Sequence, residues 1–119
     1  MAFDEQLAER IRTVLDGRQD LEERRMFGGI AFLLSGHMAC GVVGTDLMLR
    51  LGRSGAESAL AEPHVRPMDF TGRPSSTMVF VDRDGTASDQ ALAVWLRRAT
   101  EHVRTLPAKT KPTAPRDNG

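Results

Sequence analysis

The stretch LEERRMFGGIAFLLSGHMACGVVGTDLMLRL, residues 21–51, decides the fold of this chain. Short apolar segments follow one another here, separated only by turn-forming residues such as Gly28-Gly29 and Ser35-Gly36. Connections of this length join antiparallel strands, because parallel strands need a crossover of a dozen or more residues. The sequence therefore predicts an antiparallel meander, with strands over residues 22–27, 30–34, 38–43 and 47–51.

The last of these strands shows the two faces of the predicted sheet most clearly. Leu47, Leu49 and Leu51 alternate with Met48 and Arg50, so one face of the strand is made only of leucine. A face of this kind needs cover. A second apolar set, which contains Met48 and Met78, is also too apolar for a solvated surface, so we expect a homodimer.

Amphipathic segments flank the meander and supply that cover. Residues 4–16 and 89–106 carry apolar residues at helical spacing, and in the second segment these are Leu92, Trp95, Leu96, Ala99 and Val103. A shorter helix is expected over Ser54–Ala61, with Ser54 and Glu57 as a capping box. Residues 65–70 are expected to be an edge strand or irregular because of Pro67, and a further strand is expected over 77–81. The fold class is thus α+β, with N- and C-terminal helices packed on one face of an antiparallel sheet.

Length and composition indicate one globular domain over residues 1–106 and a tail over 107–119. The tail contains three prolines and no large apolar residue, so we expect it to be disordered. The longest apolar stretch, Ile30 to Leu34, is too short to cross a membrane. The N-terminus lacks an apolar signal region and the chain has one cysteine, so we expect a cytoplasmic protein.

Charge is balanced overall but unevenly placed. Residues 1–96 carry ten basic and fourteen acidic residues, and residues 97–119 carry six basic and two acidic residues. A zero net charge and the absence of tyrosine disfavour direct, specific binding of nucleic acid. We interpret the basic end as a solvated helix face and tail rather than a phosphate-binding surface. Its residues are Arg97, Arg98, Arg104, Lys109, Lys111 and Arg116.

Four motifs carry a family resemblance. They are Met26-Phe27-Gly28-Gly29-Ile30-Ala31-Phe32, Cys40-Gly41-Val42-Val43-Gly44, Leu47-Met48-Leu49-Arg50 and Arg66-Pro67-Met68-Asp69-Phe70-Thr71-Gly72. With them the chain resembles the N-terminal domain family of TfoX, also called Sxy, from about Phe3 to Leu106. The resemblance implies a two-layer fold similar to the secretion chaperones and a link to regulation of natural competence and transcription. The helical second half of those regulators does not follow here, so we expect a stand-alone regulatory domain that acts through a protein partner.

The motif Met26-Phe27-Gly28-Gly29 has two interpretations. A phosphate-binding loop would need glycines between a strand and a helix N-terminus, with a lysine or hydroxyl nearby. A strand follows here instead, and no lysine occurs before Lys109. We therefore expect a structural motif, with a tight turn or bulge at the glycines and Phe27 anchored in the core.

The segment around Arg66, Asp69, Phe70 and Arg73 is the candidate partner-binding surface. Asp69 could pair with either arginine, and Phe70 could stack on a ligand, because exposed aromatic residues on loops often mark binding. The alternative is structural: Met68 or Phe70 closes the sheet edge, and Asp69 caps the turn that follows.

No catalytic or metal-binding constellation stands out, so we expect no enzyme activity, no cofactor and no metal. His37 and Cys40 are an odd number of positions apart, which on a regular strand places them on opposite faces. We expect a buried cysteine and a histidine on a surface turn, with His64 and His102 elsewhere. The acidic residues Asp82, Asp84 and Asp89 fit a turn and a helix N-terminus better than a cation loop. The remaining alternative is a small-molecule or hydrolytic site around Cys40 or Arg66–Arg73.

Removal of the tail tests the domain boundary. Deletion from Pro107 onward should leave the melting temperature unchanged, because residues 107–119 offer no apolar side chain whose burial could offset their ordering entropy. Thermal unfolding of the full chain and the truncated chain, followed by circular dichroism, makes the comparison. A drop of several degrees on truncation would show that the tail packs on the domain.

Overall fold

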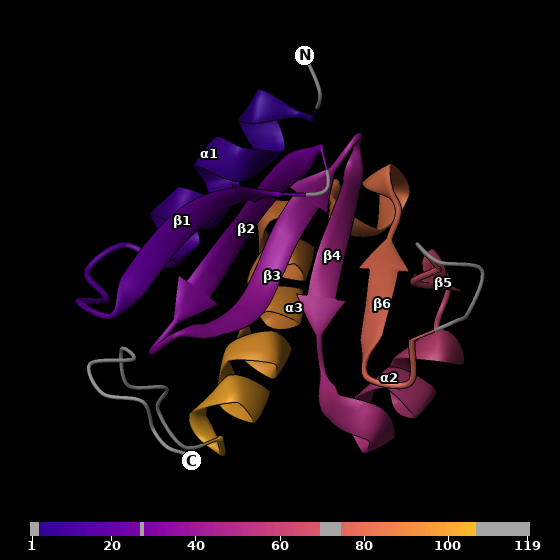
Figure 1. Ribbon diagram of the computed structural model, residues 1–119. Helices are drawn as coiled ribbons and strands as arrows, with labels where there is room; N and C mark the ends of the chain where they lie inside the picture. The colour runs from indigo at the N-terminus through magenta and orange to yellow at the C-terminus, as the bar shows by residue number, and fades with distance from the viewer. Residues whose placement is uncertain (1–2, 27, 70–74, 107–119) are drawn as a thin grey trace.

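The computed structural model describes residues 3–26, 28–69 and 75–106, which form an α+β domain built on one antiparallel sheet (Figure 1). The strands are β1 (Leu21–Met26), β2 (Gly29–Leu34), β3 (His37–Val43), β4 (Asp46–Arg50), β5 (Val65–Pro67) and β6 (Met78–Val81). The helices are α1 (Glu5–Val14), α2 (Gly52–Leu60) and α3 (Asp89–Arg104), and the 3-10 helix η1 (Arg83–Thr86) joins β6 to α3. None of these helices is long and apolar enough to span a bilayer.

The sheet confirms the predicted meander and adds one change of order. Its six strands are arranged β1-β2-β3-β4-β6-β5, and all neighbours are antiparallel. The chain leaves β4 through α2, forms β5 at the edge, and returns as β6 between β4 and β5. Pro67 lies in this edge strand, where the missing N–H group of proline is tolerated.

The main core lies between the sheet and the helices, and Figure 1 shows α1 and α3 behind the same face of the sheet. Leu47 and Leu49 are fully buried there, and Leu51 is 5% exposed. The burial of each leucine stabilises the domain by about 2 kcal/mol. The expected apolar stripe of the last helix is buried as predicted, at Leu92, Trp95, Leu96, Ala99 and Val103. The two-layer α+β prediction is therefore confirmed.

Helix starts were predicted correctly for the terminal helices but not for α2. The Asp4 carboxylate accepts a hydrogen bond from the N–H of Gln6 at 3.0 Å and begins α1. The capping box proposed for Ser54 is wrong, because α2 begins at Gly52 with no side-chain cap. Gly52 has a φ of +77°, and a Cβ there would lie 2.5 Å from the His102 ring. This turn into α2 therefore requires glycine.

The glycine pair forms a tight turn, as expected. Met26 pairs with Gly29 across the β1–β2 hairpin, and Gly28 has a φ of +73° in open space. Gly29 is needed for another reason, since a Cβ on it would lie 2.0 Å from the Val42 carbonyl oxygen of β3. The predicted core position of Phe27, the turn over 71–74 and the disordered tail all lie outside the described residues.

The two glycines should respond differently to substitution. We expect Gly29→Ala to cost about 3 kcal/mol of unfolding free energy or more, because the new methyl group would meet the backbone of a neighbouring strand. Gly28→Asn should cost less than about 1 kcal/mol, because asparagine tolerates positive φ and the space around Gly28 is open. Urea denaturation measures both costs. Equal costs would contradict the close approach of β2 and β3.

Candidate functional site: the open face of the sheet

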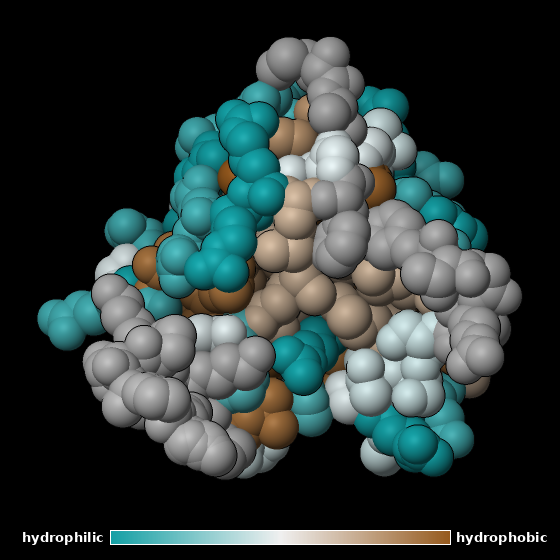
Figure 2. Space-filling model, viewed as in Figure 1, coloured by the Kyte–Doolittle hydropathy of each residue, from teal (hydrophilic) through white to brown (hydrophobic). Residues whose placement is uncertain are grey.

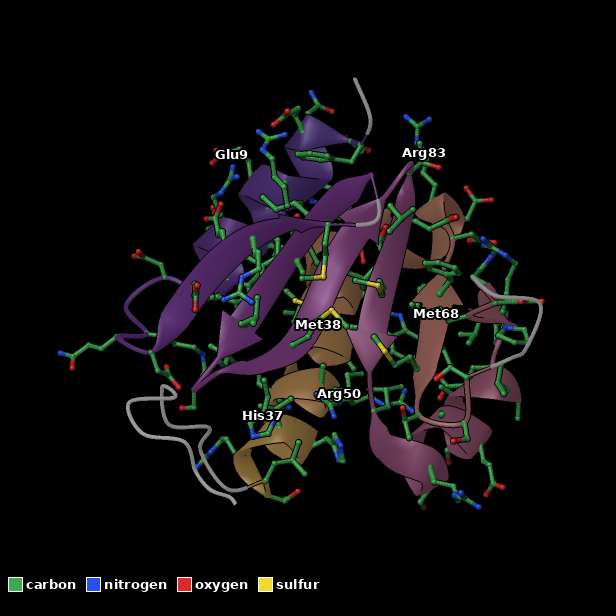
Figure 3. All side chains as sticks on the ribbon, in the orientation of Figure 1. Glu9, His37, Met38, Arg50, Met68 and Arg83 are labelled. Carbon is green, nitrogen blue, oxygen red and sulfur yellow. The ribbon has the colours of Figure 1, made fainter. Side chains whose placement is uncertain are left out.

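The face of the sheet turned away from α1 and α3 is the main candidate surface. We call it the open face, and we call the apolar residues gathered on it the open-face cluster. Its buried members are Ala31, Leu33, Met48, Met68 and Phe80, and its half-buried members are Met26, Met38, Val43 and Met78. No described helix contributes a residue to this cluster. Figure 2 shows hydrophobic residues across the centre of this face, and Figure 3 shows their sulfur atoms in front of the sheet.

Strand register explains how the sequence produces this surface. Residues that pair across antiparallel strands lie on the same face, and Met48 pairs with both Gly41 and Phe80. Leu33 pairs with Met38 in the same way. All five described methionines belong to the cluster, out of six in the chain. The apolar set containing Met48 and Met78, noted in the sequence, is thus the one that no described helix covers, whereas the leucine set is covered by helices.

Ion pairs border the open face on two sides. On β1, Arg24 donates a hydrogen bond to Glu22 at 2.8 Å, and both pair with open-face residues of β2. Towards the other edge, Arg66 binds Asp46 at 2.7 Å, and its guanidinium lies 5.3 Å from the centre of the Phe80 ring. The hydrogen bond that Arg66 donates to Asp46 is the main reason that the pKa of Arg66 is raised. Each border therefore carries one acidic and one basic side chain.

The predicted partner-binding set is only partly assembled. Arg66 lies on β5 at the border of the open face, but its carboxylate partner is Asp46 and not Asp69. In the sheet, β6 lies between β4 and β5, so the pair of Asp46 and Arg66 reaches across the end of β6. Local sequence patterns could not predict this contact. Asp69 is exposed, and Met68 is buried in the open-face cluster, as the structural interpretation expected. Phe70 and Arg73 lie outside the described residues.

Two predictions about His37 are wrong. It lies in β3 and is only 7% exposed, so it is not on a surface turn. The register between β2 and β3 shifts at Phe32/Leu33, and Phe32 pairs with Cys40 while Leu34 pairs with His37. Because Phe32 and Leu34 share a face, this bulge puts Cys40 and His37 on the same face instead of opposite ones. Burial, Arg50 and the nearby His37 lower the pKa of His102 on α3.

Cys40 is a core residue, as expected. It is fully buried, and desolvation raises the pKa of its thiol to about 12. A thiol needs to lose its proton to act as a nucleophile. The surroundings of Cys40 therefore disfavour the hydrolytic alternative at this position.

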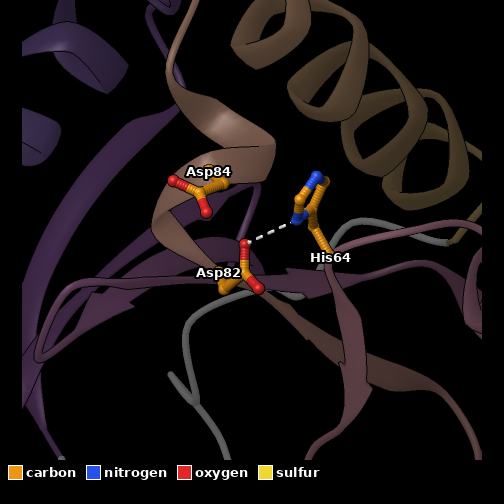
Figure 4. Close-up of side chains that lie close together, drawn as sticks. All are labelled: His64, Asp82 and Asp84. Atoms are coloured by element: carbon orange, nitrogen blue, oxygen red, sulfur yellow. Dashed lines mark ion pairs between the residues drawn. The ribbon is translucent and has the colours of Figure 1, made fainter.

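The structure brings His64 close to two aspartates that the sequence placed together in a turn. His64, directly before β5, and Asp82 and Asp84, after β6, place their ligand atoms within 4.8 Å of one another (Figure 4). The turn interpretation also holds, because Asp82 accepts a hydrogen bond from the N–H of Gly85 at 3.2 Å. The cluster was missed because it depends on the pairing of β5 with β6, which are separated by ten residues. In the sequence, Asp82 and Asp84 were the only members of the cluster that indicated a possible cation-binding loop.

Among the described residues of the basic end, Arg98 is paired within the domain. Arg98 donates to Glu62 at 2.8 Å, and its guanidinium lies 4.5 Å from the centre of the Trp95 ring. Trp95 is 7% exposed, which confirms its predicted burial. The lysines of the basic end lie outside the described residues.

Fold and sequence together define the class of protein. The family model described as the TfoX N-terminal domain matches residues 13–103, so the chain belongs to this family. No curated protein and no solved structure shows a significant match to the chain. The resemblance carried by the four sequence motifs is therefore confirmed at the level of the family.

Burial of Cys40 predicts a chemically inert thiol. In the native protein we expect its reaction with Ellman's reagent to be at least a hundredfold slower than in urea, because the sulfur is inaccessible and stays protonated at neutral pH. Absorbance at the release of the aromatic thiolate follows both reactions, and Cys40→Ala gives the blank. Rapid release of one equivalent from folded protein would restore Cys40 as a candidate nucleophile.

Proposed function

We propose that this domain is a regulatory module that acts through contacts with proteins, and that the open face of its sheet is the contact surface. The observation that carries the proposal is the open-face cluster, which gathers the described methionines on the sheet face that no described helix covers. Methionine is flexible and polarizable, and it is frequent at surfaces that adapt to a partner. Family membership supports a regulatory role, including a link to competence and transcription.

A second copy of the chain is the occupant that this surface fits best. Both borders of the open face carry one acidic and one basic side chain, Glu22 with Arg24 and Asp46 with Arg66. Two copies related by a two-fold axis can therefore set opposite charges against each other while their methionines meet at the centre. The zero net charge of the chain adds no overall repulsion between copies.

The competing proposal, a small-molecule or hydrolytic protein, has less support. Burial disfavours Cys40 as a nucleophile, and Arg66 is already bound to Asp46. The free, buried cysteine also fits a reducing compartment, and we propose the cytoplasm.

Charged substitutions on the open face test the proposal. Met38 and Met78 are half-buried members of the cluster, and the double variant Met38→Glu/Met78→Glu should be monomeric under conditions in which the wild type is a dimer. A buried charge without a partner opposes association. Val94, 43% exposed on α3, provides the matched control, and Val94→Glu should remain dimeric. Sedimentation velocity at micromolar concentration measures all three proteins.

Each outcome has a definite meaning for the proposed surface. A monomeric wild type, or a dimer that survives the double substitution with the fold intact by circular dichroism, would contradict the homodimer. The regulatory part is tested by affinity capture with the same three proteins as bait. Recovery of a transcription component by the wild type and Val94→Glu, and its loss with the double variant, is the expected result.

A further inference from the structure

The cluster of His64, Asp82 and Asp84 lies outside the open-face cluster and has no part in the function proposed above. His64 comes directly before β5, whereas Asp82 follows β6 as the N-cap of η1 and Asp84 lies in η1. The backbone fixes these segments together, because the N–H of Asp82 donates to the carbonyl oxygen of His64 at 2.8 Å and Val65 pairs with Val81. The two sides of the cluster are therefore held in place by the sheet.

Close packing brings the imidazole over this turn. His64 has a φ of +71°. The side chain of His64 packs against Gly85, where a Cβ would lie 2.8 Å from the Cβ of His64. Figure 4 shows His64 and Asp82 facing each other, with Asp84 close to them. The position of the imidazole is thus fixed by the strained backbone of His64 itself and by the absence of a side chain at Gly85.

The distances suit a metal ion. Nδ1 of His64 lies 3.2 Å from Oδ1 of Asp82. Two ligands that each lie about 2.1 Å from a tetrahedral zinc ion are separated by roughly 3.4 Å, so this pair already has the spacing of adjacent ligands. The three ligand atoms lie within 4.8 Å of one another, and Asp84 is exposed, so a small rotation of its side chain completes the set.

The charge and the access also favour a cation. Two carboxylates share this site with one imidazole, and among the described ion pairs Asp84 takes part in none and Asp82 pairs only with His64. Arg66 is close enough for the charge of Asp82 to act on it, but its hydrogen bonds go to Asp46. The side chains of His64 and Asp82 are 43% and 40% exposed, so ions and water reach the cluster from solvent.

We propose that His64, Asp82 and Asp84 bind one divalent transition-metal ion of the zinc class, through one imidazole nitrogen and two carboxylate oxygens. The remaining coordination positions face solvent and hold water. Imidazole nitrogen favours zinc and its neighbours over magnesium and calcium, which prefer oxygen ligands alone. The ion replaces the hydrogen bond between His64 and Asp82 and joins β5 to η1. This inference reverses the expectation from sequence that the protein binds no metal.

Calorimetric titration of the chelator-treated full chain with zinc chloride tests the site. We expect saturable binding of one ion per chain, with a clearly weaker response to magnesium chloride. Asp84→Asn should weaken zinc binding about tenfold or more, and because Asp84 is exposed the substitution should leave the fold intact. His64→Gly should have a similar or larger effect, since glycine accepts the positive φ while removing the imidazole.

Asp16→Asn is the matched control, because Asp16 is an exposed carboxylate outside the cluster and the substitution changes the net charge equally. It should bind zinc like the wild type. Zinc should also raise the melting temperature of the wild type and of Asp16→Asn but not of Asp84→Asn. No saturable binding of zinc, equal affinity for magnesium, or unchanged affinity in both Asp84→Asn and His64→Gly would overturn the proposal.

Discussion

The burial of one face of the antiparallel sheet beneath α1 and α3 is the interaction on which the rest of the structure depends. Leu47, Leu49 and their neighbours on β2, β3 and β6 form a continuous apolar surface that only helices cover. Side chains alternate between the two faces of a strand, so burial of the leucine face also decides which residues lie on the open face. A shift of one residue in the register would move each side chain to the opposite face. The position of the open-face cluster therefore follows from the packing of the leucine face.

This division gives the domain two surfaces of different chemistry. The helix-facing side is made of leucine, valine and aromatic residues and contains the inert thiol of Cys40. The open face contains the described methionines, a residue type that fills irregular spaces and accepts varied partners. Ion pairs of Glu22 with Arg24 and of Asp46 with Arg66 border it, so that the apolar centre is framed by both signs of charge. Such an arrangement fits the contact surface that we propose.

Local patterns in the sequence were sufficient to predict helices and strands, but they were insufficient to predict the contacts between them. The alternation of Leu47 with Met48 and the stripe from Leu92 to Val103 predicted a strand and a helix correctly, because both depend on short-range periodicity. The bulge beside Cys40 has no local signal, so His37 was placed on the wrong face. The start of α2 at Gly52 depends on packing against His102, and the His64 cluster on the pairing of β5 with β6. Each of these features arises from contacts distant in sequence.

The central claim is that the methionines of the open face form a contact surface between proteins. Methyl NMR of protein labelled only at the methionine methyl groups tests it most directly, because the described methionines all belong to the open-face cluster. The account predicts that the signals of Met26, Met38 and Met78 shift with protein concentration, and that a mixed sample of labelled and unlabelled chains shows intermolecular contacts at these methyl groups. Signals that stay constant across the concentration range, with no intermolecular contact, would contradict it.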